Sequence, residues 1–241
     1  MTKPLLEAKN ITKTFGSGHV QVRAVDSASL SLRGGELTLL MGPSGSGKTT
    51  LLSMLGCMLT PSKGTLRICG VSAEKASPEK LAEIRRAHIG FIFQSYHLFP
   101  TLTAAENIQL ALDIRGENGR EAEARSLKLL EKVGLGRKAK SFPRELSGGE
   151  QQRVAIARAI VSNPSVILAD EPTAALDANN GRAVMSILSE LAKEHDSAIL
   201  VVSHDSRAVP FADEIIYIED GALTDEEPSA AQSRRKSRQK N

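Results

Sequence analysis

Hydrophobic and polar residues alternate in two stretches near the start of the chain, residues 5–15 and 22–32. An alternation with a period of two predicts β-strands, and the glycine-serine turn at 16–18 predicts that they form a hairpin. The next apolar run, 36–41, shows no alternation, as expected of a strand that is buried on both faces. The chain is therefore predicted to begin with three strands, the third of which lies in a core.

Helical and strand patterns alternate along the rest of the chain. A helix is predicted from Lys48 to near Pro61, and the pattern is mainly helical from 101 to 161. Val184, Ile187 and Leu191 mark a further amphipathic helix. A strand pair is predicted at 64–71, and single strands are predicted at 89–93, 166–169, 199–202 and 215–218.

This order of elements predicts an α/β fold. Strands that alternate with helices indicate a mostly parallel core sheet, here with an antiparallel β subdomain near the N-terminus and an inserted α-helical subdomain. We expect one domain over 5–225, in which 5–94 and 162–225 form the core and about 95–161 form the helical subdomain.

A glycine-rich segment, Gly42-Pro-Ser-Gly-Ser-Gly-Lys-Thr49, fits the pattern G-x-x-x-x-G-K-[ST] and lies between a predicted strand and a helix. Glycines there let backbone N–H groups turn toward a polyphosphate, and the helix N-terminus adds its positive dipole end. Lys48 is expected to reach the β- and γ-phosphates and the Thr49 hydroxyl to bind Mg²⁺. The sequence therefore predicts a nucleoside triphosphate site. Its expected phosphate-binding residues are Gly42, Pro43, Ser44, Gly45, Ser46, Gly47, Lys48, Thr49 and Thr50.

Two acids, Asp170 and Glu171, follow the apolar strand predicted at 166–169. Because parallel strands meet at one edge with their carboxyl ends, we expect both acids beside the glycine-rich loop. Asp170 would hold Mg²⁺, directly or through water, and Glu171 would act as general base on an attacking water. Alone, such a pair is more often a solvated turn, but its combination with the loop favours a catalytic role.

A third motif, Leu146-Ser-Gly-Gly-Glu-Gln-Gln-Arg153, precedes a predicted helix. Ser147 suits an N-cap, and the glycines expose N–H groups at the helix start. The run resembles the signature sequence of the ATP-binding-cassette (ABC) ATPases, a family of P-loop NTPases, and the resemblance covers nearly all of 5–220. It implies a head-to-tail homodimer with ATP and Mg²⁺ as cofactors. In that dimer the signature would contact the ATP of the opposite subunit through Ser147, Gly148, Gly149 and Glu150.

The same resemblance implies roles for four further residues. Gln94 resembles the glutamine that links Mg²⁺ and water to the helical subdomain, Asp177 the aspartate that crosses to the partner, and His204 the histidine that senses the γ-phosphate. Phe15 stands where relatives carry an aromatic residue, often tyrosine, that stacks on adenine. The implied catalytic residues are Glu171, His204, Gln94 and Lys48, and the implied metal-binding residues are Thr49, Gln94 and Asp170.

Segments 93–103 and 168–177 resemble one subgroup, which includes the macrolide-exporter, lipoprotein-release and heterocyst-glycolipid-exporter ATPases. The resemblance implies an ATPase that energises a bacterial export or mechanotransmission complex from the cytoplasmic face of the inner membrane. Its implied partners are an FtsX-like membrane permease subunit and, in some such systems, a periplasmic membrane-fusion protein. No nucleic acid partner is expected.

Two alternatives would use the same ATP chemistry. A soluble regulatory or DNA-maintenance ATPase of the ABC type is disfavoured, because the chain has one cassette and no long heptad run. A cell-division ATPase, which activates wall hydrolases without moving a substrate, stays open as an alternative.

Composition changes this picture little. The hydrophobic content of 41% and charged content of 24% are ordinary for a soluble globular protein, and Cys57 and Cys69 match no metal or redox spacing. The formal net charge is +3, but five positive charges lie within 234–240, and the remainder of the chain sums to −2. We therefore expect 226–241 to be a disordered basic tail rather than a nucleic-acid-binding face.

Overall fold

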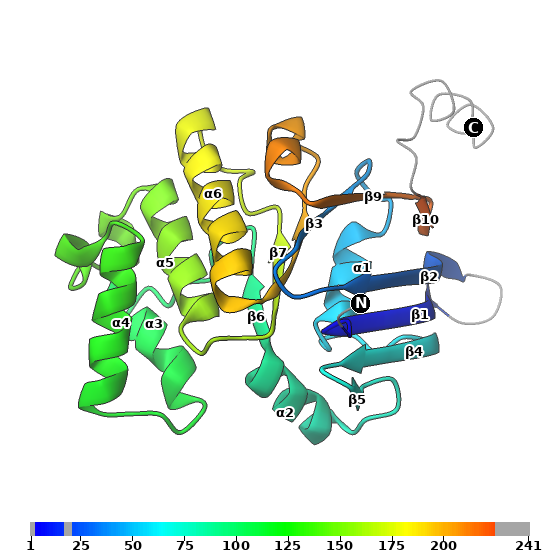
Figure 1. Cartoon of the computed structure of the whole chain (residues 1–241), viewed down its shortest axis with the longest axis horizontal. Coiled ribbons are helices and arrows are strands. Elements are labelled where there is room, and N and C mark those ends of the chain that lie inside the picture. Colours follow the sequence, from blue (N-terminus) through cyan, green and yellow to red (C-terminus); the bar gives the residue numbers. More distant parts are fainter. Residues whose placement is uncertain (1–2, 17–20, 225–241) are drawn as a thin grey trace.

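The computed structural model describes residues 3–16 and 21–224. The tail predicted at 226–241 and most of the turn predicted at 16–18 lie outside these ranges. Within them the chain forms two β-sheets with helices between and beside them (Figure 1). The predicted combination of a parallel sheet, an antiparallel sheet and a helical subdomain is confirmed.

An antiparallel sheet of four strands occupies the right side of Figure 1, in the order β2-β1-β4-β5. Leu6, Ala8 and Ile11 of β1 are buried in the core, and a register shift between Ala8 and Ile11 interrupts the alternation that the sequence predicted. Its strands are β1 (Leu6–Phe15), β2 (Val22–Leu32), β4 (Lys63–Ile68) and β5 (Val71–Ser72).

A second sheet of six strands has the order β10-β9-β3-β8-β7-β6 and is parallel apart from its edge strand β10. Val202 is paired with both Leu40 and Asp170, so the carboxyl ends of β3, β8 and β7 lie level with one another. The strands are β3 (Leu37–Met41), β6 (Ile89–Ile92), β7 (Val166–Asp170), β8 (Ala198–Val202), β9 (Glu214–Glu219) and β10 (Ala222–Thr224).

Helices cover both faces of the parallel sheet. Helix α1 packs between the two sheets in one apolar cluster, whereas α5 and α6 cover the opposite face in another. Helices α3, α4 and α5 form the helical subdomain around a third cluster, at the left of Figure 1. The helices are α1 (Lys48–Leu55), α2 (Pro78–His88), α3 (Ala104–Asp113), α4 (Arg120–Lys132), α5 (Gly148–Ile160) and α6 (Ala178–His195). Short 3-10 turns lie at Gly136–Lys138, Pro143–Glu145 and Ser206–Phe211.

The first helix, helix α2 and the short edge strand β10 differ from the sequence-based expectation, which ended its last strand at 218. The first helix ends at Leu55 rather than near Pro61, because the chain turns at Gly56 and Cys57 adopts a left-handed conformation with φ 55°. Helix α2 was not predicted, since the residue it buries is Ile84 and the rest of its surface is too polar to give an apolar stripe.

Across the described ranges, we find no helix with both the length and the apolar character needed to cross a lipid bilayer.

Candidate functional site

The glycine-rich loop follows β3 directly and leads into α1, as predicted. Gly47 has φ +103°, and a Cβ atom there would lie 2.2 Å from the backbone oxygen of Ala24 on β2. A Cβ atom at Gly42 would lie 2.2 Å from the backbone oxygen of Ile218 on β9. Both positions therefore require glycine, and the loop is packed against strands of both sheets.

A cavity of about 760 Å³ opens at this loop, at the carboxyl edge of the parallel sheet. It brings together the loop, Gln94, the two acids that end β7, and His204 after β8. Ala24 on β2 also lines it, which the sequence could not indicate because an alanine in a strand carries no chemical signal. The lining residues are Ala24, Pro43, Ser44, Gly45, Gly47, Lys48, Thr49, Thr50, Gln94, Asp170, Glu171 and His204.

The Lys48 side chain folds back onto the glycine-rich loop to which it belongs. Its Nζ atom donates hydrogen bonds to the backbone oxygens of Gly42 at 2.8 Å and Pro43 at 2.7 Å. Burial lowers the pKa of Lys48, and the nearby carboxylates of Glu171 and Asp170 oppose that shift. An anionic phosphate would give this ammonium group a stronger acceptor than the two neutral carbonyls.

The side chains beside Lys48 fit a hard divalent cation. Burial raises the pKa of Asp170, against a hydrogen bond from Thr49, and within the described chain its Oδ1 atom is buried without a hydrogen-bond partner. Mg²⁺ prefers oxygen ligands and usually keeps waters and substrate phosphates, so one carboxylate and the Thr49 hydroxyl suffice as protein ligands. The described part of the chain holds no group of three or more His, Cys, Asp or Glu side chains suited to a metal.

Glu171 adopts a left-handed conformation, with φ 47°, immediately after β7. Its N–H group donates to the backbone oxygen of Val202 at 2.9 Å, and its Oε1 atom lies 2.7 Å from Nδ1 of His204. Non-glycine residues in this conformation are uncommon and are concentrated at functional sites. From this position Glu171 lines the cavity.

The signature segment lies outside this cavity. Ser147 is exposed, caps α5 by accepting from the Glu150 N–H at 3.3 Å, and donates its own N–H to Oε2 of Glu150 at 2.8 Å. Gly149 is buried against Asn180, where a Cβ atom would lie 2.8 Å from that side chain. The N-cap role predicted for Ser147 is confirmed, and its hydroxyl is at the surface of the monomer.

Asp177 and Phe15 also lie apart from the residues that line the cavity. Asp177 caps α6 by accepting from the N–H groups of Asn179 and Asn180, and these bonds, chiefly those from Asn180, lower the pKa of its carboxyl. Phe15 ends β1 with 43% of its surface exposed, and Lys13 lies over its ring. The predicted ATP-binding residues therefore divide into a group at the cavity and a second group, around Ser147, Asp177 and Phe15, that does not line it.

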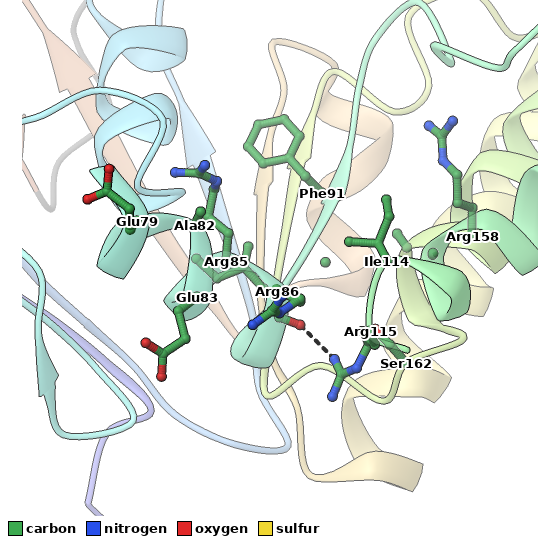
Figure 2. A pocket seen from close by; sticks show the side chains of 14 residues that line it. Glu79, Ala82, Glu83, Arg85, Arg86, Phe91, Ile114, Arg115, Arg158 and Ser162 are labelled. Atoms are coloured by element: carbon green, nitrogen blue, oxygen red, sulfur yellow. Dashed lines mark hydrogen bonds between the residues drawn. The ribbon is translucent and has the colours of Figure 1, made fainter. Parts of the chain in front are cut away.

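A second cavity, a groove of about 670 Å³, lies between α2, β6 and the helical subdomain (Figure 2). Its walls carry apolar side chains such as Phe91 and Ile114 together with several arginines. Across it, Arg115 donates to the backbone oxygen of Arg86 at 2.7 Å. The groove lies outside the phosphate cavity and none of the predicted ATP ligands lines it.

Residues 25–174 match the family described as ABC transporter, which includes the loop, both acids and the signature segment. This chain belongs to that family. The ABC cassette is 40% identical over 227 residues to the uncharacterised ABC transporter ATP-binding protein MJ0796 of Methanocaldococcus jannaschii, covering 92% of this chain and 97% of that protein. It is 42% identical over 231 residues to the macrolide export ATP-binding/permease protein MacB of Shewanella oneidensis, covering 96% of this chain. The chain spans only 35% of the length of that relative.

Solved structures of MJ0796 have the same fold as this ABC cassette. A dimeric post-hydrolysis state bound to ADP and phosphate superposes with a TM-score of 0.85 at 41% identity, covering 92% of this chain and 97% of that one. A dimeric structure described as a bacterial ABC transporter cassette gives the same values. The predicted P-loop ABC ATPase fold is therefore confirmed.

Proposed function

We propose that this ABC cassette binds ATP with Mg²⁺, hydrolyses it, and thereby energises a membrane transporter. The proposal rests mainly on the cavity at the carboxyl edge of the sheet, which is lined by the glycine-rich loop with Lys48 and by Asp170 and Glu171. Phosphoryl transfer to water needs positioning and charge stabilisation, and this cavity supplies a cation and two carboxylates beside the glycine-rich loop.

Each side chain has a separate part in the proposed reaction. Lys48 would bind the β- and γ-phosphates, while Thr49, Asp170 and Gln94 would hold Mg²⁺, whose charge offsets that of the transferred phosphoryl group. Glu171, which lines the cavity immediately after β7, would accept a proton from the attacking water. His204, at Oε1 of Glu171, would orient that carboxylate and lie against the γ-phosphate.

The active form that we propose is a head-to-tail homodimer. Ser147 is exposed at the start of α5 and lies outside its own cavity, so it is accessible to a second copy. Helix N-termini bind anions, and this one carries two glycines whose N–H groups a partner's phosphate would approach. The dimeric state of MJ0796 with ADP and phosphate supports this arrangement by analogy. Asp177 would also face the partner, and Phe15 would stack on adenine.

We further propose a membrane partner. The curated relatives from Shewanella are macrolide export proteins that join an ATP-binding part to a permease part, and this cassette matches about a third of their length. By that analogy, the cassette would act at the cytoplasmic face of the membrane on an FtsX-like permease, as part of an exporter or a mechanotransmission complex. A periplasmic membrane-fusion protein would complete the assembly.

The test begins with the purified chain. We expect Mg²⁺-dependent release of phosphate from ATP, and we expect Lys48→Ala to weaken binding of a fluorescent ATP analogue at least about tenfold, because a charge-assisted contact is lost. Lys128→Ala, on the exposed face of α4, is the matched control and should bind like the parent. Equal binding by parent and Lys48→Ala would contradict the assignment. Copurification from native membranes with a permease would support the transport proposal, and recovery only in a soluble complex would contradict it.

A further inference from the structure

The chain crosses from the core into the helical subdomain through a strained turn. It leaves β6 at Ile92, passes Gln94 and reaches α3 at Ala104. Within this crossing Tyr96 and His97 both have left-handed backbones, with φ 60° and 47°. Two such residues in succession are uncommon without glycine and persist only where surrounding groups hold them.

Arg158, on the signature helix α5, holds this turn. Its Nη2 atom donates to the backbone oxygen of Tyr96 at 2.7 Å, and its Nη1 atom donates to that of His97 at 2.5 Å. The guanidinium fork can serve two neighbouring carbonyls at once, which an ammonium group cannot do with the same geometry. In Figure 2, Arg158 extends from α5 at one side of the groove and points away from Arg115.

Burial supports a specific role for this contact. The Arg158 side chain is half-buried, and burial lowers the pKa of its guanidinium. A buried cation needs acceptors for its donors, and the carbonyls of Tyr96 and His97 provide two. The turn and the arginine therefore stabilise each other.

The side chain of Tyr96 contacts the other end of the same helix. A Cβ atom on Gly148, the first residue of α5, would lie 2.9 Å from the Tyr96 hydroxyl. The turn thus contacts α5 at its first residue through a side chain and at Arg158 through its backbone.

The remainder of the crossing is fixed to the helical subdomain by Asn107. This fully buried side chain accepts from the Phe99 N–H at 2.8 Å and donates to the backbone oxygens of Phe99, Leu102 and Thr103 at 3.0 to 3.1 Å. The crossing from Tyr96 onward is therefore bonded to helices α3 and α5.

We propose that Arg158 is a positioning residue that fixes the turn after Gln94 to the signature helix. Gln94 in one nucleotide site then moves together with Ser147, which the proposed dimer presents to the other site. The expected change in kinetics rests on the proposed function, whereas the contact between Arg158 and the turn does not. Arg158 would thus couple the two nucleotide sites of the dimer without contacting either of them.

The first test needs no nucleotide. Arg158→Lys keeps the charge but loses the fork, so amide hydrogen exchange in a peptide covering 93–100 should accelerate by about tenfold in the ATP-free protein. Arg125→Lys is the matched control, because Arg125 on α4 also donates to a backbone oxygen of the helical subdomain, that of Val161 at 2.6 Å. We expect it to leave exchange at 93–100 unchanged. Unchanged exchange in Arg158→Lys would overturn the proposal.

The second test separates positioning from general destabilisation. We expect Arg158→Lys to lower kcat for ATP about tenfold while KM and the Kd of the monomer for ATP stay within about twofold, since misplacement affects the reacting geometry and not the phosphate loop. Arg158→Gln, which keeps one planar pair of N–H donors, should show the same split and serves if the lysine variant folds poorly. If Arg158→Lys and Arg125→Lys lowered kcat in proportion to their losses in melting temperature, the positioning role would be overturned. A parent chain that hydrolyses no ATP would contradict the proposed function, while the exchange result would still decide the contact.

Discussion

His204 and Glu171 meet across the carboxyl edge of the parallel sheet, where Nδ1 of the histidine lies 2.7 Å from Oε1 of the glutamate. The glutamate side chain is 12% exposed and the histidine side chain 68%, so the histidine covers the carboxylate on its solvent side. The two residues follow adjacent parallel strands, which brings them together although 33 positions separate them in the sequence.

This contact makes Glu171→Gln the sharpest test of the proposed chemistry. Glutamine keeps the size and a polar contact to His204 but cannot accept a proton from water, so we expect kcat to fall by about 10²- to 10⁴-fold. ATP binding should be retained, and the unhydrolysed ATP should hold a dimer that gel filtration detects. Glu190→Gln, on α6, is the control and should hydrolyse ATP like the parent. Parental turnover by Glu171→Gln would show that another group is the base.

Ser147→Ala should distinguish the role of the phosphate cavity from that of the signature segment, which would contact the partner's nucleotide. The monomer should bind ATP normally, because Ser147 lies outside its own cavity, but hydrolysis should be lost with the partner's contact. Losing the N-cap should also cost about 1 kcal/mol of stability.

Thr103→Ala provides the matched control, since Thr103 caps α3 with the same reciprocal pair of bonds through Glu106. Both variants should lower the melting temperature by about 2–4 °C, and only Ser147→Ala should lose hydrolysis. If Ser147→Ala lost ATP binding and hydrolysis equally, the assignment of Ser147 to the partner's site would be wrong.

Asp170→Asn should stabilise the nucleotide-free protein while reducing its activity. Burial raises the pKa of Asp170, and Oδ1 is buried without a partner among the described residues, so the charged carboxylate is unfavourable in the empty site. We expect a melting temperature higher by a few degrees, about 1 kcal/mol, at neutral pH without Mg²⁺. Mg²⁺-dependent hydrolysis should fall by at least about tenfold, and thermal melts with and without Mg²⁺·ATP measure both effects. A lower melting temperature would mean that the carboxylate is favourably paired.

Cys57 should make stability decrease at alkaline pH. Burial raises the pKa of its thiol to about 11 from 9.0, so the unfolded chain releases this proton at lower pH than the folded one. The folded pKa is the higher one, and the stabilisation is therefore complete below pH 9 and is lost as the pH rises. At pH 10.5 the loss amounts to about 2 kcal/mol.

Urea denaturation at pH 8 and pH 10.5 measures this effect. Between these two pH values, the free energy of unfolding of Cys57→Ala should fall by about 2 kcal/mol less than that of the parent. The free energy of unfolding of Cys69→Ala should fall by as much as that of the parent. A parental pH dependence in Cys57→Ala would show that other groups cause the loss.

Much of the site could be predicted because its residues belong to local patterns. The loop from Gly42 to Thr49 follows the buried strand β3, the two acids lie at the carboxyl end of β7, and the parallel sheet brings such strand ends together. The N-cap role of Ser147 was likewise readable, because a capping box depends on residues three positions apart.

The features that were missed depend on contacts between distant residues or on backbone conformation. Arg158 bonds to carbonyls 61 and 62 positions earlier, and its place within a helical repeat gives no sign of this. The left-handed backbone of Glu171 is also invisible to composition, because nothing in a single sequence distinguishes it from an extended strand end. Helix α2 did carry a signal, since Ser77 and Pro78 form an N-cap and a first helical position, but its polar surface hid it.

The contacts made by Asn107 and Arg158 attach the first crossing between the two halves of the cassette to the helical half. The chain crosses between them twice, and Arg125 secures the second crossing by its bond to Val161. At the second crossing, the backbone oxygens of Pro164 and Ser165 accept from the Ser197 hydroxyl and the Ala198 N–H group of the core. Each crossing is therefore bonded to the part of the cassette beside it, and any movement of the helical half would carry the turn after Gln94 with it.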